Sequence, residues 1–332
     1  MTTKVGINGF GRIGRLTLRA IEERQKQDLE IVAVNGHSDS ALDAHLLKWD
    51  STYGRYPGQI ESGNGSIIID GKSVAILSER NPEEIPWSEY GVELVIEATG
   101  AFTKAQKAAA HLKGSVRKVV ISAGCDDADV TLVMGVNEEK YRPQEHRIIS
   151  NASCTTNCVA PVVKTLHETF GIIRGMMTTV HACTNDQRLL DGTHKDLRRA
   201  RAAGTSMIPT KTGAARMIGV VIPELSGKID GMSIRVPTPA VSAVDLVVTV
   251  NKKASKEEVN QALKNASQLK PGIIEYCDEQ LVSVDFKGNP ASCIIDAPST
   301  MVIDTMIKII AWYDNEWGYC CRLADLAAFV AL

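Results

Sequence analysis

The chain has 332 residues, of which 44% are hydrophobic, so it is long and apolar enough to bury the cores of two ordinary domains. Its 37 basic and 39 acidic residues leave a formal net charge of -2. This balance offers no basic surface for nucleic acid or for an anionic membrane. We therefore expect neither a nucleic-acid partner nor a membrane partner.

The N-terminal segment and the cysteines indicate the compartment. Met1 to Lys4 leads straight into an apolar strand without a basic and apolar leader, and no stretch offers 18 uninterrupted apolar residues. The eight cysteines are spaced irregularly and match neither a zinc site nor a disulfide scaffold. The sequence therefore predicts a cytoplasmic protein with reduced thiols and no metal site.

The first 150 residues alternate short β-branched runs with helical patterns. The expected elements in chain order are strand 5–8, helix 12–24, strand 31–34, helix 40–48, strand 94–97, helix 104–112 and strand 118–121. Parallel strands cannot be joined by a tight turn, so alternation of this kind indicates parallel strands with crossover helices. We predict a doubly wound parallel sheet.

After about residue 150 the pattern changes. We expect strands 175–180, 232–236 and 243–250 with helices 155–170 and 256–264, which is typical of an α+β domain with a mixed or antiparallel sheet. The stretch from Cys183 to Met207 is polar and Arg-rich, with one short helical piece around Leu197, and so long an irregular segment is usually functional. Tyr319 to Leu332 is predicted to be an apolar helix.

A glycine motif joins the first strand to the first helix. Gly9, Gly11 and Gly14 permit a tight turn and a close backbone approach, and the helix N-terminus offers free N–H groups to a pyrophosphate. This placement predicts a Rossmann-type dinucleotide-binding domain over residues 1–150 and a catalytic domain over residues 151–315. A C-terminal helix (316–332) is expected to pack back on the first domain.

The end of the second strand bears on the choice of cofactor. This position normally carries a carboxylate that binds the ribose hydroxyls and repels a 2′-phosphate. Here the strand is followed by Gly36, and then by His37 and Ser38, whose side chains can both donate to phosphate. The sequence therefore admits NADP as well as NAD.

The candidate reactive centre is Cys154, at the junction of a strand and the helix expected from Thr155. A helix N-terminus favours the thiolate, so we expect a lowered pKa for Cys154. His181 closes a strand in the same domain and can act as the base. Each residue also has a structural interpretation, since a buried cysteine often only packs and a lone histidine often only forms hydrogen bonds.

At this point the sequence resembles the glyceraldehyde-3-phosphate dehydrogenase family. The shared motifs occur in the family's order across nearly the whole chain. They are Gly9–Arg15 (GFGRIGR), Ala152–Asn157 (ASCTTN), Thr179–Gln187 (TVHACTNDQ), Asp196–Arg201 (DLRRAR), Thr212–Ala215 (TGAA), Arg235–Thr238 (RVPT) and Trp312–Tyr319 (WYDNEWGY).

The resemblance implies a phosphorylating oxidation of glyceraldehyde 3-phosphate to 1,3-bisphosphoglycerate. Cys154 would attack the aldehyde, His181 would take the proton, and hydride would pass to NAD or NADP. Inorganic phosphate would then attack the thioester on Cys154. The family also implies a homotetramer, with the loop from Cys183 to Met207 near a neighbour's cofactor.

By the same resemblance, two anion sites and a cofactor site can be assigned. The substrate's own phosphate would lie at Thr184, Arg199 and Arg235, and the attacking phosphate at Ser153, Thr155, Thr212 and Gly213. The cofactor would lie at Gly9, Gly11, Arg12, Ile13, Gly14, Gly36, Arg80, Ser122 and Asn315. Singly, each threonine or arginine is more often a solvated surface residue, and the motif context is what singles them out.

Three positions depart from the family pattern. NAD-specific members carry Asp where this chain has Gly36, and usually carry Pro where it has Thr193; both changes remove an obstacle to a 2′-phosphate. Gly124–Cys125 stands where a proline is common. The first two departures, Gly36 and Thr193, lead us to a hypothesis of dual NAD and NADP specificity.

Other functions remain open at this point. Erythrose-4-phosphate dehydrogenase shares the fold and the chemistry, although the intact segment Lys211–Ala215 favours the triose substrate. A cysteine hydrolase using Cys154 and His181 would leave the glycine motif and Asn315 unexplained. A catalytically silent dinucleotide- or RNA-binding module would not need the cysteine and histidine.

Overall fold

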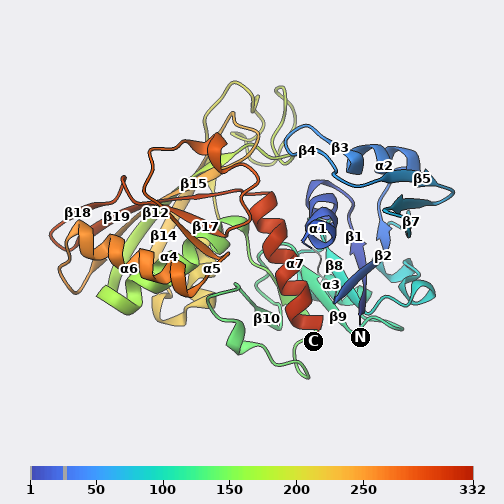
Figure 1. Cartoon of the computed structure of the whole chain (residues 1–332), viewed down its shortest axis with the longest axis horizontal. Helices are drawn as coiled ribbons and strands as arrows, with labels where there is room; N and C mark the ends of the chain where they lie inside the picture. Colours follow the sequence, from blue (N-terminus) through green and yellow to red (C-terminus); the bar gives the residue numbers. More distant parts are fainter. Residues whose placement is uncertain (1, 25–27, 332) are drawn as a thin grey trace. The chain divides into compact units, whose positions relative to one another are not determined.

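The structure is a computed structural model that describes residues 2–24 and 28–331 (Figure 1). It divides into two units, one formed by residues 1–132, 139–152 and 320–332, the other by residues 133–138 and 153–319. Each unit contains its own large sheet. No helix among the described residues combines the length and apolar character needed to cross a membrane.

The first unit is built on a nine-stranded sheet in the order β10-β11-β9-β8-β1-β2-β7-β6-β5. Its neighbours pair in parallel from β10 to β7, and only β6 and β5 are antiparallel additions. The strands are β1 (Thr3–Asn8), β2 (Leu29–Asn35), β5 (Ile60–Gly63), β6 (Ser66–Ile69), β7 (Lys72–Leu77), β8 (Leu94–Glu97), β9 (Lys118–Ile121), β10 (Val130–Thr131) and β11 (Ile148–Ser150).

The helices of this unit include α1 (Arg12–Glu23) and α2 (Ser40–Lys48), and a two-stranded ribbon of β3 (Trp49–Asp50) and β4 (Gly54–Arg55) follows α2. The helix predicted over 104–112 is shorter than expected. It is α3 (Ala105–Ala108) followed by a 3₁₀ turn (Ala109–His111). The buried His111 ring accepts a hydrogen bond from Trp87 Nε1, which ties the end of this segment to the core.

The last helix, α7 (Trp317–Ala331), crosses from the second unit into the first at Cys320, and Leu332 lies outside the described residues. Arg24 Nη1 donates 3.1 Å hydrogen bonds to Asp325 Oδ1 and to the Cys321 carbonyl. Lys118 Nζ donates to the Val330 carbonyl at 2.6 Å. The C-terminal residues thus pack against elements of the first unit.

The second unit contains a mixed eight-stranded sheet in the order β13-β14-β12-β15-β19-β17-β16, with β18 paired to β19. The strands are β12 (Ile172–Ala182), β13 (Ile208–Lys211), β14 (Ile229–Val236), β15 (Ser242–Val250), β16 (Ile274–Cys277), β17 (Cys293–Asp296), β18 (Met301–Ile303) and β19 (Met306–Tyr313). A parallel-rich sheet in one unit and a mixed sheet in the other confirm the predicted fold class.

Three helices accompany this sheet: α4 (Cys154–Phe170), α5 (Ala214–Val221) and α6 (Lys256–Leu269) (Figure 1). Helix α4 contacts β12, β15, β17 and β19, and α5 contacts β14. Along the strands, buried residues such as Met177 and Ile309 alternate with more exposed ones such as Met176. This alternation is typical of a sheet that has one face packed on a core.

The long segment from Cys183 to Met207 contains no helix among its residues, so the short helical piece expected around Leu197 is wrong. The Asp196 side chain accepts hydrogen bonds from the backbone N–H groups of Arg198 and Arg199, and Gly192 N donates to the Ala200 carbonyl across the loop. Because these contacts fold the segment on itself, it turns rather than continuing as a helix.

Helix α6 offers a direct test of this core. Leu263 is fully buried and Leu269, on the same helix, is 81% exposed. We expect Leu263→Ala to lower the free energy of unfolding by about 2–5 kcal/mol, because it leaves a cavity. Leu269→Ala serves as the control and should change it by less than about 0.5 kcal/mol. Denaturant unfolding measures both, and equal effects would contradict this packing.

Candidate active site

Cys154 is the first residue of helix α4. Ser153 caps the helix: its hydroxyl accepts a 3.1 Å hydrogen bond from the backbone N–H of Thr156. Ala152, just before the cap, has a φ of 53°, which non-glycine residues seldom adopt. This local strain turns the chain sharply and sets Cys154 at the free N–H end of the helix.

His181 lies beside Cys154. It belongs to β12, and its Nε2 lies 3.5 Å from Cys154 Sγ. The imidazole is only 4% exposed, whereas Cys154 is partly accessible. A thiol and an imidazole from distant parts of the chain thus meet at hydrogen-bonding distance, an arrangement suited to covalent catalysis.

The other ring nitrogen determines which tautomer His181 adopts. Its Nδ1 lies 2.7 Å from the carbonyl of Ala182 and 3.0 Å from Nη1 of Arg235. The carbonyl can only accept and the guanidinium can only donate, so these two contacts favour opposite tautomers. The shorter contact, to Ala182, favours the proton on Nδ1, and Arg235 Nη1 also donates to that carbonyl at 3.3 Å. Nε2 is then left with a lone pair toward Cys154 and can take its proton.

The pKa of Cys154 is shifted in the opposite direction to the one predicted from the helix N-terminus. Burial raises the pKa of the Cys154 thiol, and the positive charge of Arg235 is the strongest influence that lowers it. Burial, together with Arg235, lowers the pKa of His181 to about 3. The predicted lowering of the cysteine pKa is therefore wrong for this structure, because burial outweighs the helix terminus. These directions favour the neutral thiol and the neutral imidazole over the ion pair.

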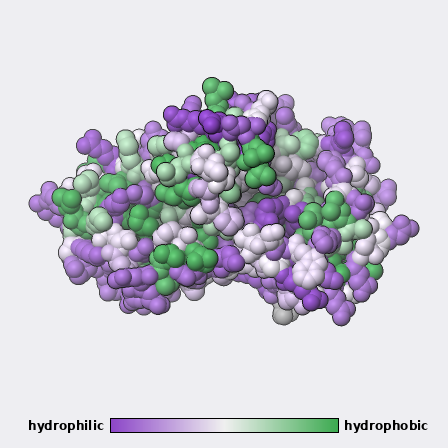
Figure 2. Space-filling view, turned by 90° about the horizontal axis from the view of Figure 1, so that it is seen from above, coloured by the Kyte–Doolittle hydropathy of each residue, from purple (hydrophilic) through white to green (hydrophobic). Residues whose placement is uncertain are grey.

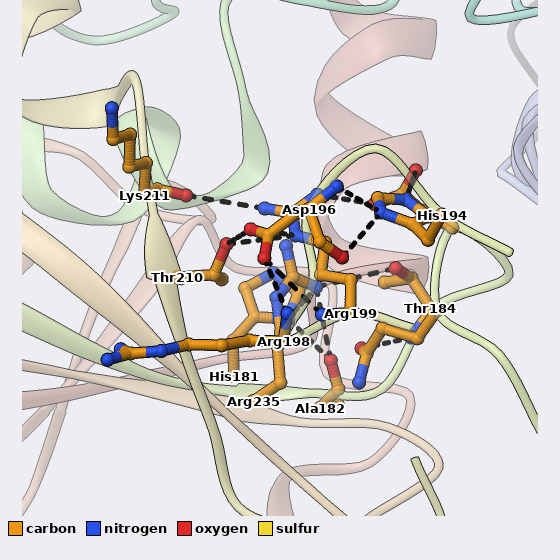
Figure 3. Close-up of polar contacts among 12 residues, drawn as sticks. His181, Ala182, Thr184, His194, Asp196, Arg198, Arg199, Thr210, Lys211 and Arg235 are labelled. Atoms are coloured by element: carbon orange, nitrogen blue, oxygen red, sulfur yellow. Dashed lines mark hydrogen bonds and ion pairs between the residues drawn. The ribbon is translucent and has the colours of Figure 1, made fainter. Parts of the chain in front are cut away.

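Two arginines, Arg199 and Arg235, and Thr184 gather beside His181 (Figure 3). Arg235 Nη1 donates a 3.4 Å hydrogen bond to Thr184 Oγ1. Burial lowers the pKa of Arg235, and the nearby positive charge of Arg199 lowers it further. Arg235 Nε is buried, and no described residue accepts a hydrogen bond from it. The structure thus brings together the three residues expected to hold the substrate's phosphate, and it leaves a donor free there.

Contacts within the loop hold Arg199 in place. Its Nη1 pairs with Asp186, its Nε donates to Thr210 Oγ1 at 2.9 Å, and Thr210 donates to Asp196 at 2.8 Å. Figure 3 shows these contacts converging around Arg199. Asp186 and Asp196 were not predicted from the sequence, because acidic residues beside arginines give no local signal of such pairing.

The four residues expected at the attacking phosphate lie at two helix N-termini. Ser153 caps α4, while Gly213 precedes α5 and the Thr212 hydroxyl accepts from Ala214 N at 3.2 Å. Gly213 and Thr212 are accessible. Thr155 is instead buried, with its hydroxyl 2.9 Å from that of Tyr313. The backbone N–H groups at these helix starts suit an anion.

The first unit contains a separate cavity of about 480 Å³ at the end of the parallel strands. Such crevices are where open α/β sheets bind dinucleotides. Four of the expected cofactor residues line it. The full lining is Asn8, Gly9, Phe10, Gly11, Asn35, Gly36, His37, Ser38, Glu79, Arg80, Ala98, Thr99, Ala101 and Phe102.

The glycines of the motif have distinct roles. Gly9 has a φ of +95°, and a Cβ there would lie 2.6 Å from the backbone N of Thr99. A Cβ on Gly14 would lie 2.1 Å from the Gly9 carbonyl oxygen, so only glycine permits this close packing of turn and helix. A Cβ on Gly11 would meet open space, which leaves room for a phosphate.

The remaining cofactor residues do not line this cavity. Arg12, Ile13 and Gly14 form the first turn of α1, and Arg12 pairs with Asp50 at 2.9 Å. Ser122 follows β9. In the second unit, the buried Asn315 accepts a 2.9 Å hydrogen bond from the hydroxyl of Ser242.

Comparisons with known proteins agree with this geometry. Residues 3–105 match the family model described as glyceraldehyde 3-phosphate dehydrogenase, NAD binding domain, and residues 153–315 match the model of its C-terminal domain. The chain is 55% identical to glyceraldehyde-3-phosphate dehydrogenase of Geobacillus stearothermophilus over 334 residues, covering 100% of this chain and 99% of the relative. It is also 55% identical to that of Streptomyces coelicolor, with 99% of each chain covered.

Arg235→Gln tests the electrostatics of the pair. Loss of the positive charge should raise the pKa of Cys154, so less thiolate forms at neutral pH. Alkylation of the thiol should slow by about tenfold if this pKa rises by about one. The measurement is the iodoacetamide rate at Cys154, followed by mass spectrometry from neutral to alkaline pH.

The control is Arg174→Gln, which changes an exposed arginine on β12, the strand that carries His181, and should leave the rate unchanged. Unchanged or faster alkylation of Arg235→Gln would contradict the role of this charge.

Proposed function

The chain belongs to the glyceraldehyde-3-phosphate dehydrogenase family of NAD(P)-dependent oxidoreductases, and we propose that it carries out the family's glycolytic reaction through a thioester on Cys154. The substrate is glyceraldehyde 3-phosphate, and the products are 1,3-bisphosphoglycerate and the reduced cofactor. The observation that carries this proposal is the 3.5 Å pairing of Cys154 Sγ with His181 Nε2 beside Arg235.

The first step uses the resting state of the pair. Nε2 of His181 takes the thiol proton as Cys154 Sγ adds to the aldehyde carbon, so the buried imidazole becomes charged only while the new C–S bond forms. The resulting imidazolium then stabilises the oxygen anion of the thiohemiacetal. When bound, NAD(P) supplies the acceptor for the hydride that leaves this carbon.

The second half of the reaction needs a second anion. Thr184, Arg199 and Arg235 hold the phosphate of the substrate, because two cations and a free donor bind it firmly. Inorganic phosphate is held near Ser153 and Thr155 at the start of α4 and near Thr212 and Gly213 at the start of α5. It attacks the thioester carbonyl, and the thiolate of Cys154 leaves.

The residues of the first unit fit a dinucleotide. The open space at Gly11 and the free N–H groups at the start of α1 suit a pyrophosphate, and Gly9, Gly36 and Arg80 line the cavity beside them. We assign Arg12, Ile13, Gly14, Ser122 and Asn315 to the cofactor as well. Gly36 carries no side chain in the space beside Phe10, so it removes a steric obstacle to a 2′-phosphate. The cavity therefore admits NADP sterically as well as NAD.

Two other functions receive less support. The pair of anion-binding sites and the high identity to dehydrogenases that act on glyceraldehyde 3-phosphate, as their names state, favour the triose over erythrose 4-phosphate. A cysteine hydrolase would have no use for the cavity lined by Gly9 and Gly11.

We also propose a homotetramer. One face of the second unit's sheet is defined by residues that pair in register on four neighbouring strands: Met232 on β14, Thr178 on β12, Asp245 on β15 and Ile310 on β19. This face is opposite the one that carries the buried Met177. On this face Met176 is 72% exposed.

The long loop also exposes apolar side chains: Leu189, Leu190 and Leu197 are each more than three-quarters exposed. Figure 2, seen from above, shows hydrophobic patches among hydrophilic ones. Such exposed apolar surface suits contact with further copies.

We place the protein in the cytoplasm. Five cysteines, Cys125, Cys154, Cys158, Cys183 and Cys277, are free thiols, and Cys158 among them is fully buried. A reducing compartment suits a chain with many unpaired thiols.

Steady-state kinetics test the reaction. We expect turnover of glyceraldehyde 3-phosphate that requires inorganic phosphate, with little or no turnover of erythrose 4-phosphate. Cys154→Ser should lower kcat by about 10⁴-fold or more and form no acyl-enzyme, because an alcohol is a far weaker nucleophile than a thiolate. Its affinity for NAD should stay unchanged. Substantial residual turnover would overturn the thioester mechanism, and a reversed substrate preference would move the assignment to the erythrose enzyme.

The oligomer is tested on the exposed sheet face. Met176→Glu should lower the molar mass measured by light scattering from that of a tetramer to that of a smaller species, because it buries a charge in the contact. Leu269→Glu, on the exposed part of α6, is the matched control and should leave the mass unchanged. A wild-type chain that is monomeric would refute the proposed assembly.

A further inference from the structure

A buried carboxylate lies behind the part of the cofactor cavity where the second strand ends. Asp43, on helix α2, is only 1% exposed. Its Oδ2 lies 3.7 Å from the point where a Cβ on Gly36 would stand, and no described residue donates a hydrogen bond to it. Gly36 itself lines the cavity. A negative group is thus present near this position although Gly36 carries none.

The second oxygen of Asp43 connects directly to the cavity wall. Ser38 lines the cavity, and its hydroxyl lies 2.7 Å from Asp43 Oδ1. An ionised carboxylate only accepts, so the hydroxyl proton of Ser38 points at Asp43. Ser38 therefore presents only lone pairs to the cavity. A ribose hydroxyl can donate to those lone pairs, whereas a 2′-phosphate dianion needs a donor.

Other charged groups near the cavity do not offset the negative charge of Asp43. Burial raises the pKa of Asp43, while the hydrogen bond from Ser38 and the charge of Arg15 lower it, and Asp39 raises it. The ionisable side chains of the cavity wall that can donate to a phosphate, His37 and Arg80, are both exposed to water, so their interactions are screened. The charge of Asp43 is buried and is screened less.

We propose that Asp43, acting through Ser38, makes this cavity select the 2′-hydroxyl of NAD over the 2′-phosphate of NADP. The proposal rests on the proposed function, since it concerns the same cofactor. It corrects the interpretation of Ser38 as a phosphate donor. Gly36 gives a 2′-phosphate room, and the Asp43–Ser38 pair disfavours it by charge and by hydrogen-bond polarity. Asp43 is a positioning residue, because its oxygens do not reach the cavity themselves.

Equilibrium binding of NAD and NADP to the cofactor-free protein, by calorimetry, tests the pair. We expect wild-type protein to bind NAD more tightly than NADP. Asp43→Asn keeps the side-chain shape, removes the charge and frees the Ser38 proton, so the ratio of the NADP to the NAD dissociation constant should fall by about tenfold or more. Ser38→Ala should weaken NAD binding several-fold and leave NADP binding almost unchanged.

The matched control is Asp39→Asn. Asp39 caps the same helix and is exposed, and asparagine retains the cap, so this variant removes one charge from the same segment without touching Ser38. Its binding ratio should equal that of the wild type.

Three results would overturn the inference: tighter NADP than NAD binding by the wild type, equal ratios in Asp39→Asn and Asp43→Asn, or an unchanged ratio in Ser38→Ala. Ser38→Ala keeps the test valid if Asp43→Asn does not fold. Failure of the wild type to bind either dinucleotide would instead refute the proposed function.

Discussion

The hydroxyl of Tyr313 joins three elements of the second unit, and the pairing of Cys154 with His181 depends on it. It lies 2.9 Å from the hydroxyl of Thr155, which follows Cys154, and 2.8 Å from that of Thr179, two residues before His181. All three hydroxyls are buried, so none can exchange its partner for water without cost. The start of α4 is thereby held against β12, and nucleophile and base stay within reach.

A comparable buried network supports the cofactor cavity in the first unit. Asn8 at the end of β1 donates to Glu97 of β8 at 2.6 Å, and Asn35 at the end of β2 donates to Asn8 at 2.8 Å and to the Glu79 carbonyl at 2.8 Å. Glu97 in turn accepts from the backbone N–H of Thr99. Loops that line the cavity are thus tied to the ends of buried parallel strands, which gives a rigid base for binding.

Several helices and strands could be predicted from local sequence patterns. Hydrophobic periodicity and helix-start residues located helix 40–48 and strands 94–97 and 118–121 to the residue, and the glycine motif indicated its turn. The strands β3 to β7, between residues 49 and 77, were not predicted, because strands of two to six residues with few alternating positions give a weak signal. The helix expected near Leu197 is absent: the Asp196 side chain accepts local hydrogen bonds from the backbone N–H groups of Arg198 and Arg199, and the Gly192 N–H donates to the Ala200 carbonyl across the loop.

The sequence by itself indicated the candidate chemistry of this protein: the proposed nucleophile Cys154, the proposed base His181 and the glycine turn, since each is recognised from residue type and from the motif around it. Tertiary structure alone decided how these groups are charged and paired. Burial raises the pKa of Cys154, Asp43 orients the hydroxyl of Ser38 behind Gly36, and Tyr313 bonds to a residue 158 positions away. Such effects arise from water exclusion and contacts between distant segments, which no local pattern encodes.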